Sequence, residues 1–336
     1  MAEFVLLVLV VALVIYAVFG GADFGAGIIE PFMRTQTDID VALAPVWEAN
    51  HVWLVLAVVL AFVGFPEFFS LATTYLHLPL LFVLLGIVAR GTAFTFRHYD
   101  PNPGGLTPWY NIAFRLGSLL TPLFLGISLA ACAAGEFPTD FNLGFYALYI
   151  APWNTAFGWA TGVFVCALFA FEGAALLSSE QALHGLPLPH ISVARGAHLL
   201  AIISGAVVFL IAYFQDLEWF NRLMHSYWAI GALTLATLMI PSVASAFDRG
   251  HPWRLRAAMA VQVTCVLFGF FAAQFPVLMR LDNRVITYQS VQAPDATLRT
   301  LIIALVVGLA IILPGLAYLI SVYKAQPTQG NVNEQF

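Results

Sequence analysis

The chain carries very little charge for its length. Only 9% of its 336 residues are charged, while 61% are hydrophobic. An ordinary soluble domain is about 25% charged. The net charge of -5 comes with no basic run, which argues against nucleic acid as a partner and against a polybasic lipid-binding segment. The composition therefore indicates an integral membrane protein whose bulk partner is the lipid bilayer.

Cysteine pairs and the common catalytic motifs are also missing. Cys132, Cys166 and Cys265 lie far apart in apolar runs and form no CxxC, so disulfide, zinc, iron–sulfur and c-type haem sites lack ligands. The sequence contains no GxGxxG, Walker A loop, HExxH or nucleophile elbow, which disfavours hydrolase and ATP-driven mechanisms. The first apolar stretch begins with Glu3 rather than a basic residue and is too long for a signal peptide, so we expect it to be retained.

What the chain has instead is a succession of long apolar runs. A helix needs about 20 apolar residues to cross a bilayer. The sequence predicts an all-α integral membrane protein, with a single transmembrane domain over residues 1–336, a short C-terminal tail at 324–336 and no soluble domain. The nine predicted spans are 4–30, 48–70, 72–97, 110–134, 153–178, 196–215, 225–246, 254–279 and 299–323. The longest structured external connection is then 280–298.

The basic residues between these spans predict an orientation. One face collects Arg34, Arg97, Arg195, Arg249, Arg254, Arg256 and Lys324. The other face holds Arg222, Arg280, Arg284 and Arg299, but also Glu67, Glu136, Asp140, Asp216 and Glu218. Because cytoplasmic loops are enriched in Lys and Arg, the first face should be cytoplasmic, which places the N-terminus outside and the C-terminus inside.

Two carboxylates stand in surroundings where water should be scarce. Asp23 lies in the glycine-rich segment 20–27, and Glu48 follows Trp47 at the start of an apolar run. An ionised carboxylate in hydrocarbon costs several kcal/mol or more, so such a group pairs, protonates or lines a water-filled path. Both are candidates for function, and Gly21 and Gly25 beside Asp23 allow close approach of another helix.

Glu48 and His51 are three residues apart on a helix and share a face, with Asn50 on a neighbouring face. A carboxylate beside an imidazole is suited to proton transfer. The alternative is a satisfied polar network that fixes the register of the helix.

Arg90 falls inside the third predicted span and cannot be neutralised, so it must find an acid, carbonyl oxygens or water. Asp23 or Glu48 could supply the negative charge, and Asp23 is the preferred partner. Arg97, seven residues further on, is expected to extend to the cytoplasmic headgroups. Glu172 is a third acid within a span, and the sequence does not reveal its partner.

Haem ligation by the chain itself has weak support in the sequence. His51, His77 and His198 fall in or beside predicted spans, where imidazoles from facing helices can ligate b-type haem. No two of them occur at a spacing that picks out such a site. We therefore predict no metal site and no directly bound cofactor.

Several motifs together resemble subunit II of the cytochrome bd-type quinol oxidases, including the cyanide-insensitive branch. They are Gly21-Ala22-Asp23-Phe24-Gly25-Ala26-Gly27, Pro45-Val46-Trp47-Glu48-Ala49-Asn50-His51-Val52-Trp53, Arg90 and Leu116-Gly117-Ser118. The resemblance implies nine transmembrane helices arranged as two four-helix bundles plus one peripheral helix. The first bundle would cover about 1–134, and the second bundle with the extra helix about 150–323.

The resemblance also implies partners and roles. In that family the b-type haems, any haem d and the quinol-oxidising loop belong to subunit I, so this chain would be the haem-free half of a heterodimer that oxidises quinol and reduces dioxygen. The expected location is the bacterial cytoplasmic (inner) membrane. A structural quinone and a small single-span accessory subunit stay open.

For individual residues, the resemblance places Glu48 at the acid that receives protons from the cytoplasm, and Asp23 and Arg90 at positions tied to cofactor assembly. Trp47, Asn50, His51 and Glu172 are candidates to support that path or a polar network, and His51 occupies a variable position in the family. The family often has an amide at the position of Glu172, so no role transfers to that acid.

Two other classes of function remain open from the residues alone. A proton- or ion-coupled secondary transporter would use Asp23, Glu48, Arg90 and Glu172 as its site. Such transporters usually show corresponding broken helices in two halves of the chain, and none are evident in the sequence. The third hypothesis is a purely structural assembly subunit.

Overall fold

The computed structural model describes residues 1–32, 37–99, 107–183 and 191–325, and within the second helix it describes side chains from Asn50 onward. Nearly all of this chain is helical. The long helices are α1 (Ala2–Ile29), α2 (Thr37–Gly64), α4 (His77–Tyr99), α5 (Thr107–Ala134), α7 (Ala156–Leu183), α8 (Ile191–Phe214), α10 (Tyr227–Arg249), α11 (Pro252–Gln274) and α12 (Asp295–Ala325). A 3₁₀ turn, η1 (Glu30–Phe32), extends α1.

Eight helices of the described chain are long and apolar enough to cross a membrane. A ninth span arises if 50–64 of α2 and the short helix α3 (Pro66–Tyr75), which are bent by 114° to each other, are counted as one. The prediction of about nine spans is confirmed on that count.

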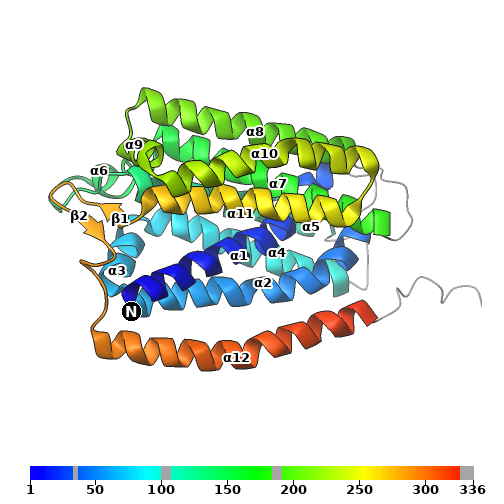
Figure 1. The fold of residues 1–336 in the computed structure, drawn as a ribbon, viewed down its shortest axis with the longest axis horizontal. Helices are drawn as coiled ribbons and strands as arrows, with labels where there is room; N and C mark the ends of the chain where they lie inside the picture. Colours follow the sequence, from blue (N-terminus) through cyan, green and yellow to red (C-terminus); the bar gives the residue numbers. More distant parts are fainter. Residues whose placement is uncertain (33–36, 100–106, 184–190, 326–336) are drawn as a thin grey trace, which may run out of the picture.

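The long helices form two bundles that lie side by side (Figure 1). In the first, α1 packs on α2 and α5, and α4 packs on α5; in the second, α7 packs on α8 and α11, and α11 packs on α10. The bundles meet where α7 packs on α1 and α5. Helix α12 runs along the outside of the first bundle, where it contacts mainly α2, and it is the peripheral helix (Figure 1).

Short elements cover one end of the molecule. They are α3, α6 (Phe145–Tyr149), α9 (Glu218–His225) and the antiparallel hairpin of β1 (Val277–Arg280) and β2 (Val285–Thr287) (Figure 1). The predicted span 254–279 is therefore wrong at its end, because α11 stops at Gln274 and 277–279 belong to β1. The external connection 280–298 holds most of the hairpin, which the sequence analysis did not anticipate.

The second predicted span, 48–70, is also wrong in its limits. Helix α2 begins at Thr37 and ends at Gly64. Pro66 starts α3, and Phe65 before it has φ -136° and ψ 62°, outside the helical region. A residue before proline is disfavoured in the helical region, because the proline Cδ collides with its backbone. The chain turns here instead of continuing straight through the bilayer.

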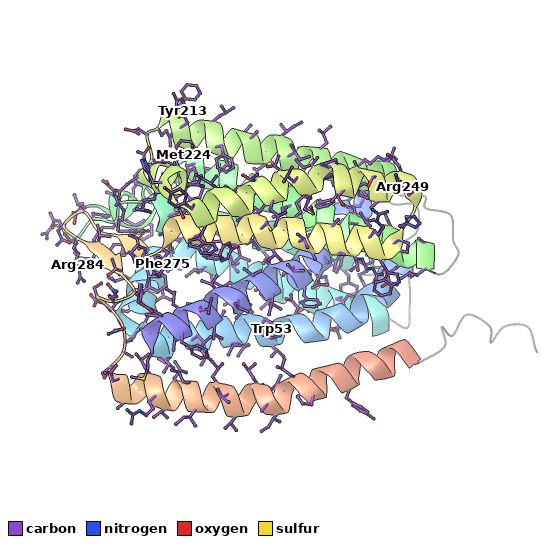
Figure 2. All side chains as sticks on the ribbon, in the orientation of Figure 1. Trp53, Tyr213, Met224, Arg249, Phe275 and Arg284 are labelled. Atoms are coloured by element: carbon purple, nitrogen blue, oxygen red, sulfur yellow. The ribbon has the colours of Figure 1, made fainter. Side chains whose placement is uncertain are left out.

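The two ends of the bundle carry different side chains. Arg284 and Phe275 lie at the end with the hairpin, and Arg249 lies at the opposite end (Figure 2). Each end has an ion pair: Arg284 pairs with Glu67 near the hairpin, and Arg195 pairs with Asp248 at the other end. These arginines, which were predicted to lie on opposite faces, thus lie at opposite ends of the bundle.

Candidate functional site

Asp23 and Arg90 form an ion pair in the core of the first bundle. Arg90 Nη2 lies 2.6 Å from Asp23 Oδ1, and the two side chains are 2% and 1% exposed. The same nitrogen donates to the backbone oxygen of Asp23 at 3.1 Å, and Arg90 Nε donates to Ser118 Oγ of α5 at 3.1 Å. The predicted pairing of Arg90 with Asp23 is confirmed, and it ties α4 to both α1 and α5.

A second buried acid, Glu30, was not recognised in the sequence. Its carboxylate accepts hydrogen bonds from Arg97 at 3.1 and 3.4 Å, and the side chains of Arg97 and Glu30 are 5% and 0% exposed. Arg115 of α5 approaches it to 3.5 Å. The expectation that Arg97 extends to the headgroups is wrong, because Glu30 in η1 gives this guanidinium an ionic partner inside the protein.

One aromatic ring lies between the two arginines. The guanidinium carbon of Arg90 lies 4.9 Å from the centroid of the Phe114 ring, and that of Arg97 lies 4.7 Å from it. Arg90 also lies 5.0 Å from the ring of Phe24. Aromatic faces attract cations, particularly where water is excluded. These rings therefore support two cations that would otherwise repel each other.

The glycines around Asp23 allow α1 and α7 to touch through their backbones. A Cβ at Gly25 would collide with the backbone oxygen of Phe169, and a Cβ at Gly173 would collide with the backbone of Ala26 and Gly25. Neither backbone can move aside as a flexible side chain could. The close approach predicted for Gly21 and Gly25 is confirmed, and it occurs where the two bundles meet.

Glu172 lies at this crossing. Its side chain is fully buried, and neither carboxyl oxygen has a hydrogen-bond partner among the described residues. A Cβ at Gly21 would collide with Glu172 Oε2, so the carboxyl group lies against the bare backbone of α1. The structure therefore brings Glu172 and Asp23 to the same segment of α1, but only Asp23 has a cationic partner.

The structure describes only some of the side chains around Glu48. Glu48 and Trp47 lie in α2, but their side chains are outside the described ones, so the proposed couple of Glu48 and His51 stays a prediction. Asn50 is buried, its amide lies against Gly20, and its Oδ1 has no hydrogen-bond partner among the described atoms. His51 follows Asn50 on the same helix. Asp23 Oδ2 also has no hydrogen-bond partner in the described part of the chain.

His198 and His77, the other histidines considered as haem ligands, contact other groups of the protein. His198 Nε2 lies 3.1 Å from Gln262 Oε1, and its ring stacks on Phe171 with centroids 4.4 Å apart. His77 Nδ1 lies 2.8 Å from the backbone oxygen of Thr74, at the start of α4.

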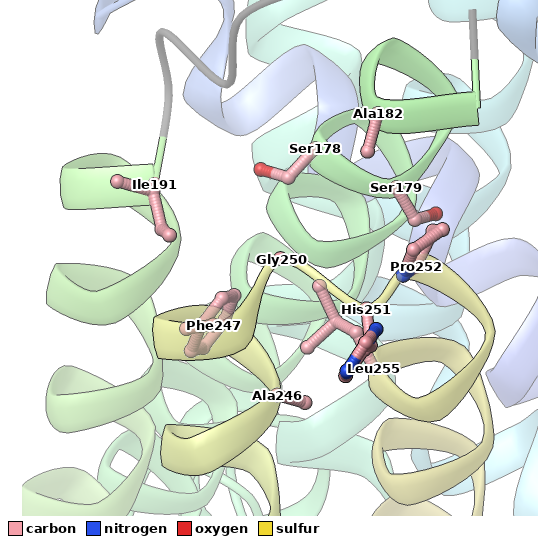
Figure 3. A pocket seen from close by; sticks show the side chains of 10 residues that line it. All are labelled: Ser178, Ser179, Ala182, Ile191, Ala246, Phe247, Gly250, His251, Pro252 and Leu255. Carbon is pink, nitrogen blue, oxygen red and sulfur yellow. The ribbon is translucent and has the colours of Figure 1, made fainter. Parts of the chain in front are cut away.

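A small pocket lies at the end of the second bundle opposite the hairpin (Figure 3). It is lined by Ser178 and Ser179 of α7, by Phe247 of α10 and by His251 and Leu255 at the start of α11, among others. Its volume is about 10 Å³. That space suits a single water molecule. The structural quinone left open by the resemblance does not fit there.

The signal for Glu30 was present in the sequence. Asp23 and Glu30 are one heptad apart, as are Arg90 and Arg97, and such spacing keeps two residues on the same helix face. A pair of acids on one span and a matching pair of arginines on another indicate two ion pairs rather than one. The missing information was that α1 and α4 would lie in register.

Comparison with known proteins gives a consistent result. Residues 1–323 match the family described as cytochrome bd terminal oxidase subunit II. The chain is 30% identical over 131 residues to cytochrome bd ubiquinol oxidase subunit 2 from Bacillus subtilis (strain 168), over 38% of each chain. It is 26% identical over 179 residues to cytochrome bd-I ubiquinol oxidase subunit 2 from Escherichia coli (strain K12), over 50% of this chain and 45% of that one. The matched segments thus span less than half of these relatives.

The fold extends further than these pairwise matches. A solved structure of bd oxidase from Geobacillus thermodenitrificans contains a chain that superposes with a TM-score of 0.77 at 19% identity, covering 96% of this chain and 98% of that one. At this identity the similarity establishes the all-helical fold. Because the family match covers nearly the whole sequence, the chain belongs to the cytochrome bd terminal oxidase subunit II family.

Proposed function

We propose that the chain is the haem-free second subunit of a quinol oxidase that reduces dioxygen to water. The observation that carries the proposal is the family match over residues 1–323. The relatives named as ubiquinol oxidase subunits support quinol as the substrate of the whole complex. The complex would consist of this chain and a haem-bearing subunit I in the bacterial inner membrane, with b-type haems, and haem d where present, held by subunit I.

The haem-free assignment is supported by how the histidines are used. His198 is engaged by Gln262 and Phe171, and His77 lies against a backbone oxygen at a helix start. The isolated folded chain should therefore show no stoichiometric Soret band. Such a band would overturn this part of the proposal.

The proposed role of Asp23 and Arg90 is to hold the first bundle in the form that subunit I requires. Their ion pair has almost no exposure to solvent, and it connects α1, α4 and α5 through one guanidinium. Removing one partner of a buried ion pair costs about 3–5 kcal/mol, because the other charge is left uncompensated. The pair would therefore act through assembly and retention of cofactors in the complex.

The proposed role of Glu48 is to receive protons from the cytoplasm. Reduction of dioxygen consumes protons, and a buried reduction site needs polar groups that conduct them through apolar protein. Glu48 lies two residues before the buried Asn50 on α2, and His51 follows Asn50 on the same helix. Glu48 would pass protons toward subunit I, with Trp47, Asn50 and His51 shaping its surroundings.

The orientation that this role requires has the N-terminus in the periplasm and the C-terminus in the cytoplasm. It is supported by the basic residues at the end opposite the hairpin. They include Arg249 (Figure 2), Arg195, which pairs with Asp248, and Arg256 near the start of α11. Cytoplasmic loops carry an excess of such residues. In this orientation the hairpin and α9 face the periplasm.

The secondary transporter is not favoured. Transporters with inverted repeats carry discontinuous helices in corresponding positions of both halves. Among the described residues, the bent pair of 50–64 with α3 occurs in the first half only. The family match also supports an oxidase subunit rather than a solute carrier.

Two substitutions at Glu48 test the protonic role. Glu48→Gln keeps the volume of the side chain but removes its acid proton, whereas Glu48→Asp keeps the acid. We expect quinol-driven oxygen consumption per haem to fall by roughly 10²-fold in Glu48→Gln, since general acid–base groups contribute on that scale, and to persist in Glu48→Asp. If Gln supports wild-type turnover while Asp does not, Glu48 belongs to a structural network instead.

A further inference from the structure

Glu172 has no part in the function proposed above, yet its position is costly. It lies in α7 where the two bundles meet, its side chain is fully buried, and both of its oxygens lack hydrogen-bond partners among the described residues. Native proteins rarely leave such a group unsatisfied, and an exception calls for an explanation. A carboxyl group placed this way is a candidate for proton chemistry.

Close helix packing keeps a compensating cation away from Glu172. Its Oε2 atom lies where a Cβ of Gly21 would be, and the backbones of Gly25 and Gly173 touch one turn further on. Phe169 fills the space on the preceding turn of α7. A long basic side chain therefore has no room to reach the carboxyl group from α1.

The neighbouring helices bring titratable groups, several of which pair with groups other than Glu172. Among the described residues, neither oxygen of Glu172 has a hydrogen-bond partner, so no cation bonds to it directly. The helices packed against α7 carry titratable groups that pair elsewhere, namely Asp23 with Arg90, Arg115 with Glu30, His198 with Gln262 and Arg256 with Glu180. Tyr16 on α1 and His51 on α2 lie near Asp23.

The state of charge follows from these surroundings. An isolated ionised carboxylate in an apolar interior is so unfavourable that the group takes up a proton instead. Asp23, two residues after Gly21, has the guanidinium of Arg90 beside it, which favours its ionised form. One segment of α1 thus carries an acid with a cationic partner and contacts a second acid whose oxygens have no partner among the described residues, and such contrasting surroundings suit two carboxyl groups to different roles.

A second unsatisfied polar atom flanks this segment. Asn50 Oδ1 has no hydrogen-bond partner in the described part of the chain, and the Asn50 amide lies against Gly20, the residue before Gly21. Two adjacent glycines therefore separate an amide on α2 from a carboxyl group on α7. Because glycine has no side chain, the polar groups of both bundles meet the backbone of α1 at one level.

We propose that Glu172 is a second proton-binding site of this subunit, uncharged at rest, which gives up and regains its proton during turnover. In this step the carboxyl O–H bond breaks, the proton passes to an internal water and onward to the oxygen-reduction site, and a cytoplasmic proton later restores the acid. The electrons come from quinol through the haems of the partner subunit. The inference rests on the proposed role of the subunit in proton supply.

Redox-induced infrared difference spectroscopy of the intact complex tests this inference. We expect the wild type to show a carbonyl-stretch band of a protonated carboxylic acid that changes on reduction and shifts in deuterium oxide. The band should vanish in Glu172→Gln and persist in Glu136→Gln, a control at an exposed acid. Oxygen consumption per haem should fall roughly tenfold or more in Glu172→Gln only.

Two results would overturn the inference: a difference spectrum in which Glu172→Gln keeps every such band, and wild-type oxygen consumption in that variant. If Glu172→Gln fails to assemble, Glu172→Asp serves instead, and an unmoved band in that variant overturns the inference as well. The Glu172 band is read independently of Glu48. If Glu48→Gln keeps wild-type turnover while the Glu172 band behaves as expected, the proposed role of Glu48 is wrong and the Glu172 site still stands.

Discussion

Glu30 and Arg97 form a buried ion pair with 3.1 Å between Oε1 and Nη2. The pair stands one heptad after that of Asp23 and Arg90, and in both pairs the partners are 67 residues apart in the chain. Helices α1 and α4 therefore run in the same direction and in register, although the backbone of α4 packs chiefly on α5. The connection between α1 and α4 is made largely by charge.

The pair of Asp23 and Arg90 should matter for assembly. In Asp23→Asn the guanidinium of Arg90 stays buried without its carboxylate, at a cost of about 3–5 kcal/mol. We expect the purified complex to lose haem and to dissociate more readily in detergent. Asp140→Asn, at an exposed acid, is the control. Equal haem content in both variants would contradict the role.

Glu30 should be comparably sensitive, although the sequence analysis did not select it. Glu30→Gln removes the carboxylate that Arg97 contacts and that Arg115 approaches. We expect a loss of thermal stability of the complex of about 3–5 kcal/mol. Combining Glu30→Gln with Arg97→Gln should cost less than the sum of the two single changes. Strict additivity would show that the residues do not interact.

The contact of α1 with α7 should not tolerate a methyl group. Gly25→Ala places a Cβ against the backbone oxygen of Phe169, and forcing extra volume into such a contact costs about 1–3 kcal/mol. Gly231→Ala, where a Cβ meets nothing within 4 Å, is the matched helix control and should be neutral or stabilising by about 0.5–1 kcal/mol. Thermal denaturation of the complex separates the two. An unchanged midpoint in Gly25→Ala would contradict the backbone contact.

The hairpin should be sensitive to acid. Thr139 donates from Oγ1 to Asp282 Oδ1 at 2.7 Å and from its backbone nitrogen to Oδ2 at 3.1 Å. These hydrogen bonds lower the pKa of Asp282 from its usual 3.8. Because the folded-state pKa is the lower one, the stabilisation is present above 3.8 and is lost as the pH falls through the folded value.

Hydrogen exchange of residues 277–287, corrected for intrinsic rates, measures this effect. The wild type should keep its protection down to about the unfolded pKa of an aspartate and lose it below. Thr139→Val lacks the hydroxyl group that lowers the folded-state pKa, so it should show less protection above this pH and a smaller loss below it. Thr139→Ser should retain the wild-type profile. A profile in Thr139→Val identical to that of the wild type would contradict the assignment.

Much of the fold could be predicted because a bilayer leaves few options. Apolar runs of sufficient length must be helices, so the long helices other than α2 fall within a few residues of their predicted places. The ends were less predictable. Pro66 stops α2 and begins α3, but a proline inside an apolar run also occurs in continuous helices such as α5, which contains Pro122. The hairpin at 277–287 is too short and mixed in pattern to stand out.

The ion pair of Asp23 and Arg90 could be predicted from the sequence, whereas Glu30 was not selected. Asp23 and Arg90 stood out because a charge in an apolar run is costly, and each needed the other. Glu30 did not, because it lies at the end of a span where exposure to water is the usual outcome, yet it is 1% exposed. The glycines predicted a close contact, but only the structure identifies α7 as the helix they meet.

The distance in sequence between Asp23 and Arg90 also bears on biosynthesis. With 67 residues between them and synthesis at roughly 5–20 residues per second, α1 precedes its partner arginine by several seconds. During that interval Asp23 has no guanidinium to neutralise it, so the first helix must wait at the insertion machinery or enter the lipid with its acid protonated. The arrival of α4 then completes the ion pair, so the charge of Asp23 is compensated only once both helices are present.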